Sequence, residues 1–176
     1  VTRENARSII THNRSQDIPF DQSINTYRGC EHGCIYCYAR PGHAYMELSP
    51  GLDFESRLFV KFDAAALLRK ELAKKTHCPS PLALGANTDP YQPIEREWRV
   101  TRQVLELLHD CRHPVSITTK SALIERDLDI LSAMAREHLA QVQISLATLD
   151  KELARIMEPR ATSPQRRLQT IRLLAE

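Results

Sequence analysis

Three cysteines, Cys30, Cys34 and Cys37, lie within a single stretch of eight residues. Gly29 and Gly33 directly precede the first two and give the backbone the freedom to wrap around a common centre. Three thiolates can bind three irons of a cubane cluster, which leaves the fourth iron without a protein ligand. An open coordination position is typical of a reactive metal centre rather than a sealed structural one. The spacing therefore indicates a 4Fe-4S cluster that accepts a further ligand.

The alternative for these thiols is a non-catalytic zinc or iron–sulfur binding module. A zinc ion would need a fourth ligand, for which His32, His43 and Cys78 are the candidates. Zinc fingers usually carry a second ligand pair at regular spacing, and no Cys-x-x-Cys pair follows residue 37. In the cluster interpretation His32 is only a spacer, and Cys78 and Cys111 are expected to be small buried side chains.

The pattern Cys-x-x-x-Cys-x-aromatic-Cys, with Tyr36 as the aromatic residue, resembles the signature of the radical S-adenosylmethionine (radical SAM) superfamily. Residues 25–40, 85–93 and 157–160 look like the branch related to spore photoproduct lyase. The resemblance runs from about residue 23 to the end of the chain. It implies an iron–sulfur enzyme with S-adenosylmethionine as its second cofactor and a reductant such as flavodoxin or ferredoxin as a partner.

In this family S-adenosylmethionine chelates the open iron, and an electron from the cluster cleaves it to methionine and a 5′-deoxyadenosyl radical. The radical then abstracts hydrogen from a substrate, which this sequence does not identify. The resemblance implies that Tyr36 approaches the adenine, and that Asn87 and Thr88 contact the methionine amino group. The family's usual Gly-Gly-Glu is absent there, and the two residues could instead cap a turn.

Three further residues are implied by the same resemblance to contact S-adenosylmethionine. Lys120 matches a lysine near the cofactor, and Ser145 matches a serine that contacts its ribose or methionine part. Arg160 could pair with the methionine carboxylate, because a guanidinium binds a carboxylate through two parallel hydrogen bonds. Each residue also has a simpler interpretation. Lys120 could be a solvated lysine at a strand end, Ser145 a neutral residue of a strand, and Arg160 a surface charge. No catalytic residue can be named.

The elements that must position these residues alternate between short apolar runs and helical periodicity. A loop with two prolines at 87–93 follows an apolar run at 82–86. We expect the later strands at 115–118 and 142–147, and helices over 100–111, 127–135, 149–157 and from the Ser163 cap onward, with Leu168, Ile171 and Ala175 on one face. Residues 23–27 are a candidate first strand, and 58–60 an additional strand or an excursion before a helix at 64–75.

Strand, loop and helix in this order predict an α/β fold with parallel strands. The resemblance implies a partial parallel (βα) barrel of the radical SAM type, truncated after about four of six βα units. We therefore expect an N-terminal extension at 1–22 and, at 23–176, the N-terminal part of a single core domain. The strand ends would then carry the ligands.

Bulk composition is consistent with one domain of 176 residues, 42% of them hydrophobic. No apolar run is long enough to span a bilayer, and the first residues lack the apolar stretch of a secretory signal, so a cytoplasmic protein is expected. The net charge of +2 neither requires nor excludes nucleic acid. A DNA-repair-like lyase is weakly supported, because the basic residues are dispersed: Lys74, Lys75, Arg166, Arg167 and Arg172.

Overall fold

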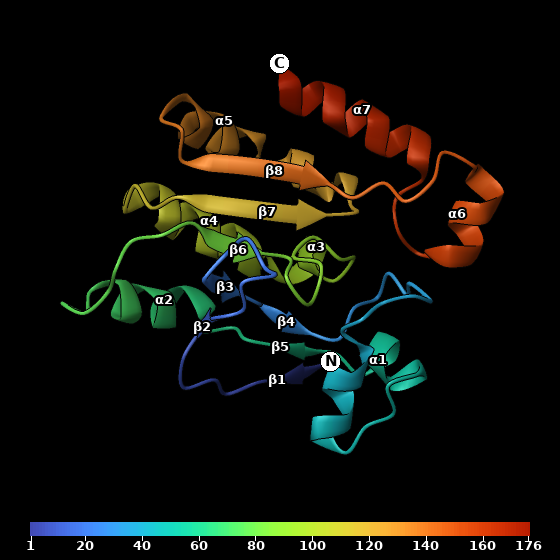
Figure 1. The fold of residues 1–176 in the computed structure, drawn as a ribbon, viewed down its shortest axis with the longest axis horizontal. Helices are drawn as coiled ribbons and strands as arrows, with labels where there is room; N and C mark the ends of the chain where they lie inside the picture. Colours follow the sequence, from blue (N-terminus) through green and yellow to red (C-terminus); the bar gives the residue numbers. More distant parts are fainter.

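The computed structural model describes residues 1–176 and contains two sheets. The larger has the strand order β2-β3-β6-β7-β8. Strands β3 (Gln22–Ile24), β6 (Leu82–Leu84), β7 (Val115–Thr119) and β8 (Ala140–Ile144) are parallel, and β2 (Ile10–His12) is antiparallel to β3 at one edge. Four parallel strands separated by helical crossovers match the predicted α/β architecture (Figure 1).

Helices connect the parallel strands and cover the sheet (Figure 1). Helix α2 (Ala64–Leu72) precedes β6, α4 (Val100–Asp110) leads to β7, and α5 (Leu128–Arg136) leads to β8. The carboxyl ends of the strands are surrounded by shorter elements: α1 (Leu52–Ser56), α3 (Glu95–Trp98), α6 (Lys151–Met157), and the 3₁₀ helices η1 (Arg40–Met46) and η2 (Ala122–Asp127). The last helix is α7 (Pro164–Ala175). None of the helices has the length and apolarity of a membrane span.

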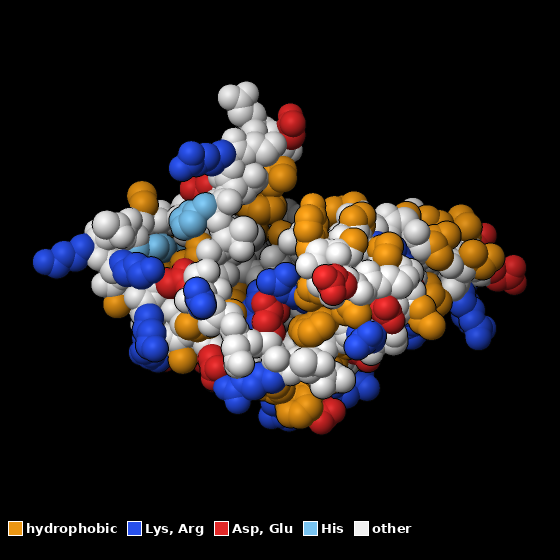
Figure 2. Space-filling view, turned by 90° about the horizontal axis from the view of Figure 1, so that it is seen from below, with side chains coloured by type: hydrophobic (Ala, Val, Ile, Leu, Met, Phe, Trp, Pro, Cys, Tyr) orange, Lys and Arg blue, Asp and Glu red, His pale blue; other side chains and the backbone are white.

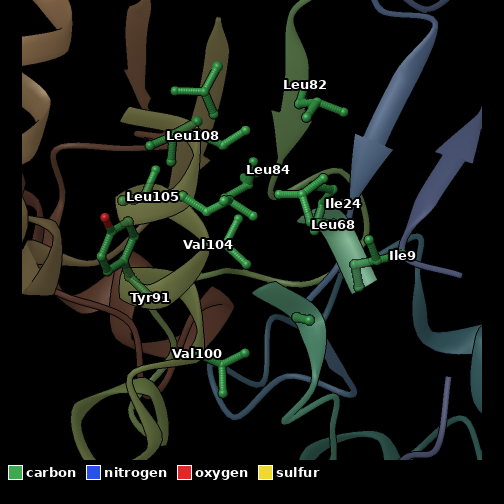
Figure 3. Close-up of a cluster of buried hydrophobic side chains, with 14 of the residues drawn as sticks. Ile9, Ile24, Leu68, Leu82, Leu84, Tyr91, Val100, Val104, Leu105 and Leu108 are labelled. Carbon is green, nitrogen blue, oxygen red and sulfur yellow. The ribbon is translucent and has the colours of Figure 1, made fainter. Parts of the chain in front are cut away.

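The core lies between the sheet and the helices α2, α4 and α5. Every residue of β6 is buried, and α4 turns Val104, Leu105 and Leu108 toward the sheet at helical spacing. Figure 3 shows these side chains facing Leu84 of β6. Both faces of β6 are covered, which explains why its sequence is a continuous apolar run rather than an alternating one.

The predicted first strand at residues 23–27 is in fact two strands in different sheets. β3 ends at Ile24, whereas β4 (Tyr27–Arg28) joins a smaller sheet with the order β1-β5-β4. The run at 58–60 contributes its middle strand, β5 (Phe59–Val60), beside β1 (Thr2–Arg3). The chain changes sheets at Asn25 and Thr26, where the Thr26 carbonyl accepts the Lys61 N–H.

The predicted apolar face of the last helix is also wrong. In α7 Leu168 is half-buried, and Ile171 and Ala175 are exposed. The residues that α7 buries are instead Pro164, Arg167 and Thr170, because the helix packs through a polar network onto η2 and the end of α6. Ser163 precedes α7 as expected but its side chain caps no N–H group.

One strand boundary and one helix cap also differ from the prediction. Strand β8 ends at Ile144 rather than near residue 147, because the chain turns away there toward α6, which Asp150 caps through the N–H groups of Glu152 and Leu153. Asp127 precedes α5 as predicted but does not cap it. Its carboxylate instead accepts a hydrogen bond from the Tyr91 hydroxyl at 3.0 Å.

Candidate cofactor-binding site

The cysteine loop begins directly after β4 and is held by backbone contacts from distant elements. The Cys30 N–H donates to the Phe54 carbonyl at 2.9 Å, and the Ile35 N–H to the Met157 carbonyl at 3.0 Å. Gly29 has φ of +78° and Gly33 of +68°. A Cβ atom on Gly29 would lie 2.7 Å from the Phe54 oxygen, so only glycine fits this close approach. The loop is therefore fixed from both sides by α1 and α6.

The three thiols line one cavity of about 120 Å³ together with the carboxyl ends of β6 and β7. Cys30 and Cys34 are buried, Cys37 is half-buried, and none of the three is in a disulfide. The opposite wall of the cavity includes Asn87 and Lys120, which follow the two strands. The three thiols and the ends of β6 and β7 therefore lie on one cavity.

Burial keeps Cys30 and Cys34 protonated when no metal is bound. It raises the pKa of Cys30 to about 12, helped by the Asp89 charge, although N–H groups of Asp89 and His32 donate to the sulfur. Burial also raises the pKa of Cys34 to about 11, opposed by the ammonium of Lys120. A metal centre must displace these protons, which a cationic cluster can do because thiolates are its preferred ligands. Three unpaired thiols in one pocket fit a cluster with three protein ligands.

His32 is not a passive spacer, because its ring is buried and lies against Asp89. His32 Nε2 is 3.1 Å from Asp89 Oδ2. The Asp89 carboxylate also accepts the Thr119 hydroxyl at 2.6 Å and the Lys120 N–H at 2.7 Å. Burial opposes ionisation of Asp89, but His32 and these donors together hold its pKa below the ordinary value. Asp89 therefore ties the cysteine loop to the end of β7.

A second carboxylate, Glu158, gathers three of the predicted cofactor-binding residues. The Tyr36 hydroxyl donates to Glu158, and Lys120 Nζ lies 4.0 Å from the same oxygen. Lys120 Nζ also donates to the Ser145 hydroxyl at 2.9 Å and lies 5.8 Å from the Tyr36 ring centroid. The buried guanidinium of Arg167 pairs with the other Glu158 oxygen. Tyr36, Lys120 and Ser145 are thus brought together by Glu158 and Arg167. The sequence assigned neither residue to the site, although Glu158 lies in the 157–160 run that resembles the family.

The other three predicted residues are placed differently. Thr88 is buried and its hydroxyl donates to the Tyr27 carbonyl at 3.0 Å, so it anchors the loop after β6. Asn87 lines the cavity, and its N–H donates to the Asn25 side chain at 3.1 Å. Arg160 lies outside the lining of the cavity, where its guanidinium binds the Glu55 carboxylate and the Glu31 carbonyl.

The histidines and remaining cysteines complete no zinc site with the loop. His109 and His113 have the His-x-x-x-His spacing, but His113 lies before the first residue of β7, at the far end from the thiols. There it faces His77 at 3.1 Å between the Nε2 atoms. Cys78 and Cys111 are exposed, contrary to the expectation that they are buried.

Comparison with known proteins decides the family. A family profile described as the Radical SAM superfamily matches residues 24–176, which include the cysteine loop and every parallel strand beyond the start of β3. The chain belongs to the radical SAM superfamily. An uncharacterized protein of Mycobacterium tuberculosis is 41% identical over 154 residues, covering 88% of this chain and 45% of the relative. Another, from Methanocaldococcus jannaschii, is 29% identical over 153 residues, covering 87% and 54%.

The solved structures that resemble this radical SAM chain include several of spore photoproduct lyase. The lyase complexed with dinucleoside spore photoproduct has a TM-score of 0.68 and 17% identity, covering 98% of this chain and 47% of the lyase. A mutant lyase with bound AdoMet and dinucleoside spore photoproduct has a TM-score of 0.63 and 18% identity, covering 88% and 42%. The likeness confirms the partial radical SAM fold. The chain spans about half the length of these relatives.

Proposed function

We propose that the protein binds a 4Fe-4S cluster through Cys30, Cys34 and Cys37 and uses it to cleave S-adenosylmethionine reductively, so that hydrogen is abstracted from a substrate. The observation that carries this proposal is the shared cavity of the three unpaired thiols and the ends of β6 and β7. Membership of the radical SAM superfamily supports the same chemistry. The cluster and S-adenosylmethionine would supply the radical, with a flavodoxin or ferredoxin as electron donor.

The protein's own residues would hold and orient S-adenosylmethionine. Tyr36, Lys120 and Ser145 support this role because they converge beside the thiols. Lys120 is the cation among these three residues. Its ammonium donates one hydrogen bond to Ser145 and has further N–H donors, which could bind the carboxylate of S-adenosylmethionine. Asn87, which lines the same cavity, would contribute a further contact. Arg160 enters as a positioning residue that fixes the loop to α1 through Glu55.

Anaerobic reconstitution of the full-length protein with iron and sulfide tests the proposal. We expect a brown protein, a 4Fe-4S spectrum that bleaches with dithionite, and release of 5′-deoxyadenosine from S-adenosylmethionine. Cys34→Ala should lose the cluster spectrum and the product. Cys111→Ala is the matched control, because Cys111 is an exposed thiol outside the cavity. A colourless protein with stoichiometric zinc would refute the proposal in favour of a structural metal module.

A nucleic-acid substrate has less support. Two of the lyase structures contain a dinucleoside spore photoproduct, but they are only 17% and 18% identical to this chain. Figure 2 shows Lys and Arg side chains interspersed with Asp and Glu side chains on the face it displays. A surface of mixed sign provides no continuous cationic track for a phosphate backbone.

A further inference from the structure

A second and larger cavity adjoins the cofactor cavity. It has a volume of about 450 Å³, and three residues, Tyr38, Asn87 and Thr88, line both cavities. Its other walls come from the smaller sheet and from η1. A cavity of this size accommodates a small molecule or the reacting part of a larger one. Its position would place such a group next to the site where the radical forms.

The charged residues that line this second cavity are of one sign. None of its 16 lining residues is Asp or Glu, whereas Arg28 and Lys61 both contribute. The third titratable base in the lining, His43, is committed elsewhere. Its Nε2 lies 3.0 Å from the Arg57 carbonyl, and its ring packs edge-on against Phe54.

Lys61 is a half-buried ammonium without a carboxylate partner at ion-pair distance. Its Nζ donates to the Asn25 carbonyl at 2.8 Å, which uses one of three N–H donors. Burial lowers the pKa of Lys61, partly opposed by the more distant Glu4. Removing an ammonium from water is unfavourable unless a counter-charge is supplied, so an anion bound in the cavity would stabilise this lysine.

Arg28 has free donors on the same wall. Its Nε lies 2.9 Å from both carboxylate oxygens of Glu4, and its two terminal nitrogens make no hydrogen bond within the chain. Glu4 offsets one of the two cations, so Arg28, Lys61 and Glu4 together carry a formal charge of +1 (2 − 1). Two terminal guanidinium nitrogens and an ammonium can bind the oxygens of one carboxylate or phosphate.

We propose that Lys61 and Arg28 bind an anionic group, a carboxylate or a phosphate, of the substrate in this cavity. The inference rests on the proposed function in one respect, namely that the ligand of this cavity is the substrate of the radical reaction. The neighbouring exposed rings of Tyr38 and Tyr45 give the entrance an apolar surface for the remainder of the molecule. Substrate selection would thus be separated from the residues that hold S-adenosylmethionine.

Brief reductive methylation of the full-length protein with formaldehyde and cyanoborohydride tests the anion site. The extent of modification at each lysine is measured by mass spectrometry, with and without inorganic phosphate or succinate. We expect either anion to slow methylation of Lys61 while leaving the exposed control Lys70, on α2, unchanged. Stronger protection by phosphate indicates a phosphorylated substrate, and stronger protection by succinate indicates a carboxylic acid. Equal methylation of Lys61 with and without both anions would overturn the inference.

Arg28→Gln provides the second variant, since Lys61 remains available as the reporter. We expect the anion concentration for half-protection to rise about threefold to fivefold, the effect of losing one partly exposed ion contact. An unchanged half-protection concentration would remove Arg28 from the site and overturn the two-cation proposal. The assay needs neither cluster nor S-adenosylmethionine. Its failure is therefore distinguishable from failure of the radical reaction, which the 5′-deoxyadenosine assay reports.

Discussion

Neutralising Glu158 should destabilise the fold because it leaves a buried guanidinium without its counter-charge. Arg167 is only 1% exposed, and its ion pair is with Glu158, itself 3% exposed. Removing one partner of a buried pair typically costs about 3–5 kcal/mol. In Glu158→Gln, Arg167 keeps hydrogen bonds to the carbonyls of Thr162 at 2.6 Å and Ser145 at 2.8 Å. We therefore expect the free energy of unfolding to fall by an amount at the lower end of this range, about 3 kcal/mol. This corresponds to more than a hundredfold in the equilibrium constant of unfolding.

A double-mutant cycle with Arg167→Met tests the physical reason for that loss. The free energy of unfolding is measured by urea denaturation for the wild type, Glu158→Gln, Arg167→Met and the double variant. Replacing both members of a buried pair costs less than removing either alone, because no uncompensated charge remains. We expect the double variant to lose less than the sum of the single variants, by about 1–3 kcal/mol. Strict additivity would refute the charge-compensation argument.

Four other substitutions test separate features of the fold. Gly85→Ala should lower the free energy of unfolding by more than about 1 kcal/mol, because a Cβ would meet a carbonyl of β7 at φ of +93°; a normal urea midpoint would contradict this. Asp150→Ala should lower the free energy of unfolding by about 1 kcal/mol, because the N-terminus of α6 loses its cap. The Ser163 side chain caps no N–H group, so Ser163→Ala should leave the thermal midpoint unchanged. The Arg166 guanidinium lowers the pKa of Glu125 in the folded protein. The ion pair therefore stabilises the fold fully above the pKa that Glu125 has in the unfolded chain. This stabilisation is lost as the pH falls through the lower pKa of Glu125 in the folded state. Below about pH 4.3, the thermal midpoint of Glu125→Gln should therefore depend less on pH than that of the wild type. The same pH dependence in both proteins would count against the ion pair.

The parts of the fold that were predictable are those with a local cause. The helix at 100–110 was visible because Val100, Val104 and Leu108 repeat at helical spacing over a full face. The loop after β6 was visible from Pro90 and Pro93. The cysteine loop needed only spacing, since three thiols so close together have few other uses. These signals lie within about ten residues and do not depend on the rest of the chain.

The missed features depend on contacts between distant residues. Glu158 lies in a run that resembles the family, but neither its burial nor its pairing with Arg167 can be read from that run. The packing of α7 against the end of α6 buries both residues. The division of residues 22–28 between two sheets follows from pairing of Tyr27 with Val60, which local propensity cannot reveal. His32 gained its role from Asp89, 57 positions later along the chain (89 − 32). Buried polar networks of this kind are specified by tertiary structure and not by periodicity.

Strand β2 limits how this sheet can be extended. β3 already has a hydrogen-bonded neighbour on each edge, β2 on one side and β6 on the other. A further parallel strand added next to β8 can lengthen the sheet, but no last strand can bond to β3 and seal a complete cylinder. A strand that closed the sheet would instead have to bond to the outer edge of β2, which offers three residues, Ile10–His12. Closure of the barrel on this side would therefore depend on a short antiparallel edge rather than on the long parallel strands.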